Sequence, residues 1–253
     1  DNLRTYDIML NPEKCVFGVL AGKLLGFIVS SRGIEANPAK IRALSHLAIP
    51  TNLKQIQKLT GCVAALGHFI SRLGENALPL CRLLRRTEHF EWTGAATAGL
   101  EEIKAILATN PILAAPNISE PMLLYIAATH QVVSAVLVVE RETDGHKFPL
   151  QKSVYYVSTV LTPCKPRYPH YQKIAYAVFM ASQKLRHYFQ ECSIIVALEV
   201  PLNDIIDNRD ATGRIAKWAI ELLPFDITYK PRRAIKSQVL ADFCRRMDGS
   251  RTP

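Results

Sequence analysis

The stretch LLYIAATHQVVSAVLVV, residues Leu123 to Val139, decides the fold because it predicts a β-hairpin made of two apolar strands. Three more segments downstream predict strands, at residues 152–159, 193–199 and 225–229. The segment 193–199 is short and almost continuously apolar, which is typical of a central strand covered on both faces. The segment 225–229 alternates apolar and polar residues, as a strand with one solvated face does. The sequence therefore predicts a five-stranded sheet that begins with the hairpin.

Helices are expected between these strands. From Tyr168 to Tyr188 apolar residues recur at spacings of four and three, which predicts a helix packed along one side. A last helix is expected over residues 234–245. From about Pro111 the order is strand, strand, strand, helix, strand, helix, strand, helix. This order predicts an α+β or α/β fold, in which helices flank a mixed sheet.

The N-terminal part predicts a second hairpin followed by helices. Two apolar strands, CVFGVL at 15–20 and LLGFIVS at 24–30, flank the residues 21–23, Ala-Gly-Lys, whose composition suits a hairpin turn. Asn37-Pro38 supplies a helix N-cap followed by proline at the first helical position, and Pro50 ends that short helix.

A longer helix is expected after a Thr51 cap, because apolar residues recur every three or four positions as far as Leu73. Gly61 and Gly67 would lie inside it, where each glycine costs about 1 kcal/mol in helix propensity. We therefore expect another part of the backbone to approach these glycines closely. A third helix is predicted over residues 78–86.

Composition limits the class of protein. The chain has 253 residues, of which 49% are hydrophobic and 21% charged, so it can bury a substantial core and is expected to form two domains. Its formal net charge of +9 suits a polyanionic partner. The six cysteines show no zinc spacing and no disulfide pattern, and no long apolar span suggests a membrane helix. An intracellular protein, cytoplasmic or nuclear, is expected.

Several short motifs occur in a fixed order along the chain. They are NPEKCVFG at 11–18, Leu25-Gly26, Gly33-Ile34, Pro38-Ala39-Lys40-Ile41, Phe90-Glu91-Trp92-Thr93, the hairpin 123–139 and GRIAKWAIELLPFDITYKP at 213–231. Together they resemble the Pol polyprotein of gypsy-type LTR retrotransposons, in the reverse transcriptase thumb and the RNase H-like domain, and they are closest to plant elements. The resemblance covers residues 3–246. It implies the end of a palm with a primer-grip-like hairpin at 1–36, a helical thumb or connection at 37–110, an RNase H-like domain at 111–246 and a tail at 247–253.

The resemblance also implies where a metal site would lie. Active members of the family bind Mg²⁺ ions through four carboxylates, which activate water to cut the RNA of a hybrid. The matching positions in this chain are Ala127, Gln172, Glu199 and Asp242. An alanine methyl cannot bind a metal and an amide carries no charge, so we expect no metal, no cofactor and no RNase H activity.

The polymerase chemistry is also expected to be absent. In the family a pair of aspartates precedes this segment, whereas the present sequence contains no Asp-Asp pair. Leu24, Leu25, Gly26 and Phe27 correspond to the element that grips the primer end. For their side chains, an ordinary role in the strand core is the favoured interpretation.

Basic residues are the candidates for contact with nucleic acid. Lys54 and Lys58 lie four residues apart and so share one helix face, where they could follow phosphates. The other candidates are Arg72, Arg85, Arg86, Arg214, Lys217, Arg232, Arg233 and Lys236. A solvated surface would carry similar charges, so that alternative stays open. Trp218, which directly follows Lys217, is expected to anchor the core.

Three functions remain open at this point. The first is a noncatalytic segment that binds an RNA/DNA hybrid, together with the rest of a Pol polyprotein. The second is a live, metal-dependent RNase H with an altered metal set made of Glu199, Asp242, His130 and Gln172. The third is a retrotransposon remnant without activity.

Overall fold

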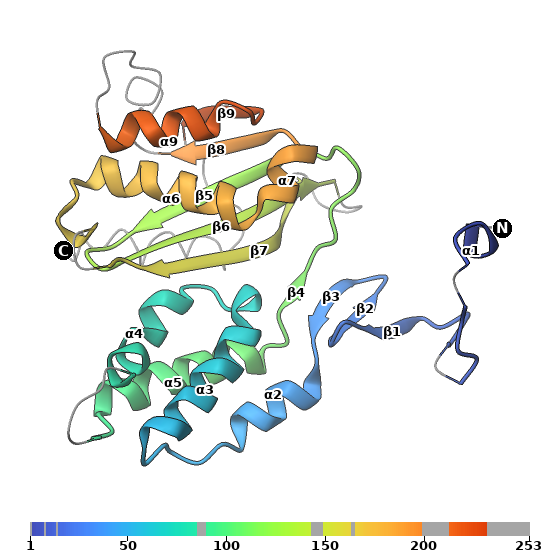
Figure 1. Ribbon diagram of the computed structural model, residues 1–253, viewed down its shortest axis with the longest axis horizontal. Helices are drawn as coiled ribbons and strands as arrows, with labels where there is room; N and C mark the ends of the chain where they lie inside the picture. The colour runs from blue at the N-terminus through green and yellow to red at the C-terminus, as the bar shows by residue number, and fades with distance from the viewer. Residues whose placement is uncertain are drawn as a thin grey trace.

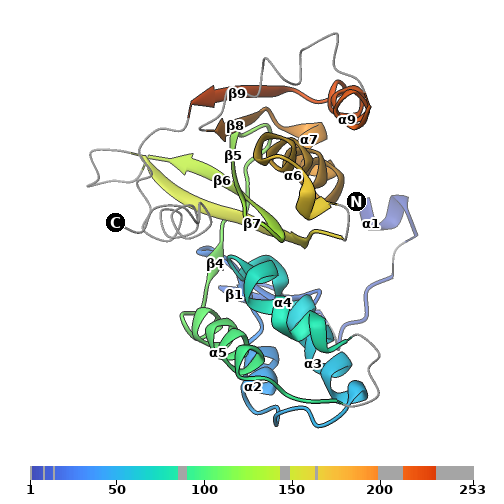
Figure 2. The same cartoon turned by 90° about the vertical axis from the view of Figure 1, so that its left-hand side faces the viewer.

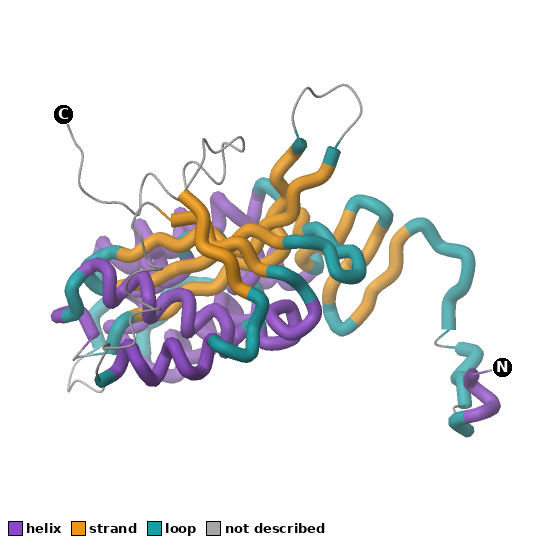
Figure 3. Tube along the Cα trace, turned by 90° about the horizontal axis from the view of Figure 1, so that it is seen from above, coloured by secondary structure: helices purple, strands orange, loops and turns teal. Residues whose placement is uncertain are grey.

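The computed structural model describes residues 2–7, 9–13, 15–84, 90–142, 149–162, 165–198 and 213–231. These residues form a five-stranded sheet, a helical lobe beside it and a smaller four-stranded sheet (Figure 1). A short helix, α1 (Asn2–Thr5), begins the chain. The segment before the small sheet extends away from the rest of the molecule (Figure 3).

The five-stranded sheet has the order β7-β6-β5-β8-β9. Its strands are β5 (Met122–Ala128), β6 (Val132–Arg141), β7 (Leu150–Val160), β8 (Ile194–Leu198) and β9 (Ile227–Pro231). β5, β6 and β7 are antiparallel neighbours, whereas β8 runs parallel to β5 and β9 parallel to β8. The predicted mixed five-stranded sheet is confirmed, and β8 is an interior strand between β5 and β9.

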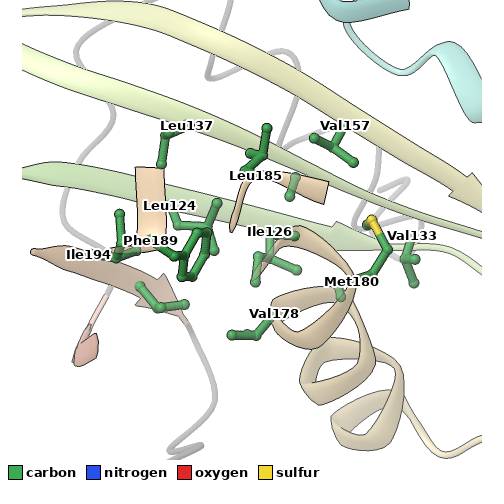
Figure 4. Packing of buried hydrophobic residues seen from close by; sticks show 14 of the residues in the cluster. Leu124, Ile126, Val133, Leu137, Val157, Val178, Met180, Leu185, Phe189 and Ile194 are labelled. Carbon is green, nitrogen blue, oxygen red and sulfur yellow. The ribbon is translucent and has the colours of Figure 1, made fainter. Parts of the chain in front are cut away.

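Helices cover one face of this sheet. They are α6 (His170–Lys184), α7 (Arg186–Glu191) and α9 (Arg214–Leu222), preceded by the 3-10 turn η2 (Lys165–Arg167). Leu124, Ile126 and Val133 from the strands pack against Val178 and Met180 of α6 (Figure 4). Burial of these large side chains stabilises the domain by roughly 2 kcal/mol for each side chain.

The helical lobe lies on the side of β6 and β7 (Figure 2). It contains α2 (Pro38–Ser45), α3 (Leu53–Ala65), the 3-10 turn η1 (Gly67–Phe69), α4 (Leu73–Leu83) and α5 (Gly94–Ala108). The predicted N-cap of α2 is confirmed, because the Asn37 side chain accepts a hydrogen bond from the Ala39 N–H at 3.0 Å. In α3 the cap is Asn52, which accepts from the Gln55 N–H, and the prediction of Thr51 was wrong by one residue.

The long helix expected through Leu73 is in fact two helices. α3 ends at Ala65, η1 follows, and Arg72 has a left-handed backbone with φ 58° before α4 begins. The apolar spacing survives the break because residues of both helices face one core. Gly61 has open space around its α-carbon, so the close approach predicted for it was wrong. Gly67 lies in the turn and meets only a side chain.

The small sheet has the order β1-β2-β3-β4. Its strands are β1 (Ala21–Leu24), β2 (Phe27–Ser30), β3 (Gly33–Ala36) and β4 (Ile112–Leu113). The first hairpin turns at Leu25-Gly26 instead of the predicted 21–23. Both turn residues have positive φ, 49° and 86°, which is the type I′ conformation that matches the twist of two antiparallel strands.

Candidate functional site

Ala127 lies deep in the molecule. It is on β5, opposite Ser134 of β6, and 0% of its surface is exposed. Its neighbours Ile126 and Ala128 belong to the core under α6, whereas Ala127 belongs to the core that includes Leu80 of α4. Because side chains alternate along a strand, position 127 faces the helical lobe.

Gln172 lies elsewhere. It is in the first turn of α6, where its N–H donates to the Pro169 carbonyl at 3.0 Å, and its side chain is partly exposed. α6 covers the opposite face of the sheet from Ala127, so the structure does not bring these two positions to one face. Glu199 and Asp242, the other two positions, lie outside the described residues.

The two described positions do not fit a two-metal centre. A methyl group has no lone pair, a neutral amide contributes no charge, and hard divalent ions require several oxygen ligands. Among the residues that the structure describes, no group of three or more His, Cys, Asp and Glu side chains could hold a metal ion.

A row of small residues crosses the sheet on the face toward the helical lobe. Ala127 pairs with Ser134, and Ser134 pairs with Ser158 of β7. The two serine hydroxyls are hydrogen-bonded at 2.9 Å, and the Ser158 hydroxyl accepts a hydrogen bond from the Gly74 N–H at 2.8 Å. We call Ala127, Ser134 and Ser158 the small-residue row. Ser158, the member of the row on β7, therefore binds the first turn of α4.

Gly74 is required at this contact. A β-carbon there would come within 2.3 Å of the Ser158 hydroxyl oxygen and 2.5 Å of a Val132 methyl. At the other end of α4, the Arg82 guanidinium donates to the Gln131 side chain at 2.8 Å. α4 is thus fixed to the sheet at both ends.

His68 lies at the junction of three elements. Its ring stacks on Tyr155 of β7, with centroids 5.3 Å apart, and meets Phe27 of β2 edge-on at 5.0 Å. A cavity of about 330 Å³ lies beside it and is also lined by Lys184. Burial and the nearby charge of Lys40 lower the pKa of His68, which favours the neutral ring.

The tip of the first hairpin is an exposed apolar projection. Leu24 is 60% exposed and Leu25 is 88% exposed, so the expectation that they form a strand core was wrong. Phe27 does pack inward, against His68 and Phe69. A leucine in the left-handed region costs about 1 kcal/mol or more, and Gly26 leaves room for the Lys40 side chain.

The predicted basic residues have different environments. Lys54 and Lys58 are exposed on α3. Arg72 forms an ion pair with Glu75 at 2.7 Å, so its charge is already compensated. Arg214 donates to the Tyr168 hydroxyl at 2.7 Å, and Lys217 is exposed on α9. Five further candidates lie outside the described residues: Arg85, Arg86, Arg232, Arg233 and Lys236.

The contact between Gly74 and Ser158 was missed by sequence reasoning. A signal existed, because Gly74 interrupts an apolar helical stretch just as Gly61 and Gly67 do. A glycine pattern alone does not say which of the three meets side chains of the sheet. Trp218, predicted to anchor the core, packs against Tyr176 and Phe179 with centroids 5.5 and 6.0 Å away.

Comparison with known proteins shows what this chain is similar to. Residues 92–196 match the model of the RNase H-like domain found in reverse transcriptase. The chain is 28% identical over 256 residues to the retrovirus-related Pol polyprotein from transposon opus of Drosophila melanogaster, and the match covers 95% of this chain. It is 26% identical over 245 residues to the transposon Tf2-3 polyprotein of Schizosaccharomyces pombe, covering 92% of this chain.

The chain is similar to retrotransposon Pol polyproteins over nearly its whole length, and residues 92–196 are similar to the RNase H-like domain found in reverse transcriptase. The match spans only 25% of the opus polyprotein and 18% of the Tf2-3 polyprotein, so the sequence corresponds to one part of such polyproteins.

Solved structures share the fold. The foamy viral protease-reverse transcriptase in complex with dsDNA matches 87% of this chain and 46% of that chain, with a TM-score of 0.68 and 18% identity. The same viral protein in complex with an RNA/DNA hybrid matches 86% of this chain and 30% of that chain, with a TM-score of 0.67. At this identity the likeness concerns the fold. In the part of the chain that the structure describes, no helix has the length and hydrophobicity to cross a membrane.

Proposed function

We propose that this chain is a noncatalytic, nucleic-acid-binding segment of a gypsy-type retrotransposon reverse transcriptase of the plant class. In this role the RNase H-like domain supports the thumb and the path of an RNA/DNA hybrid, and it cuts neither strand. The rest of a Pol polyprotein supplies the polymerase chemistry.

The burial of Ala127 carries the proposal. This position corresponds to a metal-binding aspartate in the family, yet it is 0% exposed and belongs to the core shared with α4. An aspartate there would be desolvated beneath the helical lobe, and a desolvated charge without a partner is very costly. The methyl group suits the packing of this face, so the loss of the acid is matched by a structural gain.

Two observations support the nucleic-acid partner. The chain is basic, with a net charge of +9, and Lys54 and Lys58 are exposed on one helix of the lobe. The fold is that of a viral reverse transcriptase whose structures contain dsDNA and an RNA/DNA hybrid. Phosphate contacts from such lysines give affinity without sequence preference.

Binding and cleavage can be measured together on a labelled RNA/DNA hybrid with Mg²⁺ present. We expect binding that weakens linearly in log affinity against log salt concentration, and no cleavage. The variant Lys54→Glu/Lys58→Glu should reduce the slope by about two units, because each phosphate contact contributes about 0.9.

The alternative of a live nuclease has its own control. If the wild-type chain cuts the hybrid and Asp242→Ala abolishes the cutting, the noncatalytic assignment is wrong. If the wild-type chain does not bind the hybrid at any salt concentration, the nucleic-acid assignment is wrong.

A further inference from the structure

α6 and α9 lie side by side and begin at the same end of the RNase H-like domain (Figure 2). Their first turns are joined by the hydrogen bond from Arg214 to the Tyr168 hydroxyl, just before α6. Their last turns are joined by a hydrogen bond from Gln183 to Glu221 at 3.0 Å. The two helices are therefore parallel, and their N-terminal ends form one edge of the domain.

Aromatic rings hold the cations of this edge in place. The Arg214 guanidinium lies over the Tyr168 ring, 5.4 Å from its centroid. Lys165 lies over the Tyr176 ring at 4.2 Å and donates to the Tyr176 hydroxyl at 2.8 Å. Trp218 packs behind both tyrosines, with centroids 6.2 and 5.5 Å away. These contacts reduce the mobility of two long side chains before any ligand binds.

More positive charge is exposed at the same edge. Arg167 precedes Tyr168, and Lys217 lies one turn after Arg214; both side chains are exposed. Among the described residues, neither these two nor Lys165 and Arg214 form an ion pair with a carboxylate, since the recorded pairs lie elsewhere. Within the described residues, the positive charge of this edge therefore has no carboxylate partner.

An exposed aromatic ring accompanies the cations. Tyr171, in the first turn of α6, is 41% exposed although its large ring could pack inside. Cations that follow a phosphate backbone, combined with an exposed ring on which a base can stack, are the features of single-strand binding surfaces. A paired base inside a duplex cannot offer its face to such a ring.

The edge also has a defined place in the fold. The Lys173 ammonium, in the first turn of α6, reaches the His130 carbonyl at 3.3 Å, which places this edge at the carboxyl end of β5. Gln172 lies in the same turn. We propose that this edge, made of Arg167, Tyr171, Arg214 and Lys217, binds an unpaired nucleic-acid strand. The inference rests on the proposed function and adds a second surface, for a strand that is not in the hybrid.

Charge reversal tests the edge. The edge variant is Arg167→Glu/Arg214→Glu/Lys217→Glu, and a control with the same net charge is Arg42→Glu/Arg186→Glu/Lys230→Glu, at exposed cations elsewhere. Fluorescence anisotropy with a short labelled DNA strand should show at least about tenfold weaker binding for the edge variant. Its salt slope should fall by about two units, since each single-strand contact contributes about 0.7. Affinity for a blunt hybrid should fall by about the same factor in the edge variant as in the control variant, because the two have the same net charge.

A second pair of variants separates stacking from folding. Tyr171→Phe should bind the strand like the wild type, whereas Tyr171→Ala should bind about tenfold more weakly, with circular dichroism unchanged. If the edge variant and Tyr171→Ala bind the strand as the wild type does while the hybrid still binds, the edge proposal is wrong and the proposed function stands. If the control variant loses the strand as strongly as the edge variant, only net charge matters and the edge proposal is wrong. If the wild-type chain binds neither the DNA strand nor the hybrid, both the edge proposal and the proposed function are wrong.

Discussion

The two faces of the five-stranded sheet are both buried, but they are built differently. The face under α6 is filled by large branched side chains such as Leu124, Ile126 and Leu137. The face toward the helical lobe carries the small-residue row, where the Ser134 and Ser158 hydroxyl groups are hydrogen-bonded and the Gly74 N–H donates to Ser158. Both faces are buried. Only the face toward the helical lobe requires small residues, because a β-carbon at Gly74 would overlap Ser158.

Under the proposed function, this difference would explain how a position for a metal ligand can become a packing position. Large side chains on the α6 face can be exchanged for others of similar volume at modest cost. The small-residue row cannot accept a larger or charged group, because α4 is fixed above it by Gly74 and by Arg82. The following predictions test this contrast, from the largest expected effect to the smallest.

Ala127→Asp should lower the free energy of unfolding by about 3 to 5 kcal/mol, the cost of an uncompensated buried charge. The control is Ala105→Asp on the exposed side of α5, which should cost only about 0.5 kcal/mol through helix propensity. Urea unfolding followed by circular dichroism measures both. Equal losses for the two variants would mean that position 127 is accessible to water.

Gly74→Ala should cost about 2 kcal/mol, because the new β-carbon overlaps the Ser158 hydroxyl and a Val132 methyl. Gly61→Ala is the matched control: it lies in α3 with open space around it, so it should stabilise the protein by about 0.5 to 1 kcal/mol. If Gly74 contacts Ser158 and Val132, urea unfolding should show changes of opposite sign in the free energy of unfolding for the two variants. Stabilisation by both alanines would contradict it.

Ser158→Ala should cost about 1 kcal/mol, since the Gly74 N–H loses its acceptor. The double variant Gly74→Ala/Ser158→Ala should lose less stability than the sum of the two single losses. The reason is that the Ser158 oxygen is the atom closest to the new β-carbon. A double-mutant cycle measures this coupling. Strict additivity would show that the two residues do not touch.

The smallest effect concerns pH. The pKa of His68 is lowered in the folded protein by burial and by Lys40, so the unfolded chain takes up the proton first as the pH falls. The contribution of His68 to the free energy of unfolding should be fully present above the unfolded-state pKa of about 6.5. It should decrease as the pH falls below that value. Thermal unfolding of His68→Phe, which keeps an aromatic ring, should show a weaker pH dependence between pH 7.5 and 5.5 than the wild type. Identical dependence would assign the titration to other groups.

Much of the fold could be predicted from periodicity. The strand alternation of residues 225–229, the apolar run 193–199 and the Asn37-Pro38 cap each depend on neighbours in sequence, and each was confirmed. Local patterns fail where the outcome depends on distant residues. The hairpin turn was placed at 21–23 because a glycine lies there, although Leu25-Gly26 forms the turn.

The candidate site was less predictable for the same reason. Arg72 has the sequence of a free surface cation, but Glu75 one turn later compensates it. Gly61 and Gly74 have similar helical surroundings in sequence, and only the second meets the sheet, 84 residues away in the chain. The resemblance predicts that Ala127 occupies a metal-ligand position of the family, but the packing around this residue depends on α4 and could not be predicted.

The most direct test of the central claim is metal-dependent cleavage by the variant Ala127→Asp/Gln172→Glu, which places acids at the two described positions where the resemblance implies metal ligands. The assay uses a labelled RNA/DNA hybrid with Mg²⁺, and EDTA serves as the blank. We expect a less stable protein that does not cut the hybrid, because the small-residue row is covered by the helical lobe and α6 lies on the other face. Cleavage that depends on Mg²⁺ and disappears with EDTA would contradict the account, since it would show that the sheet can still assemble a metal centre.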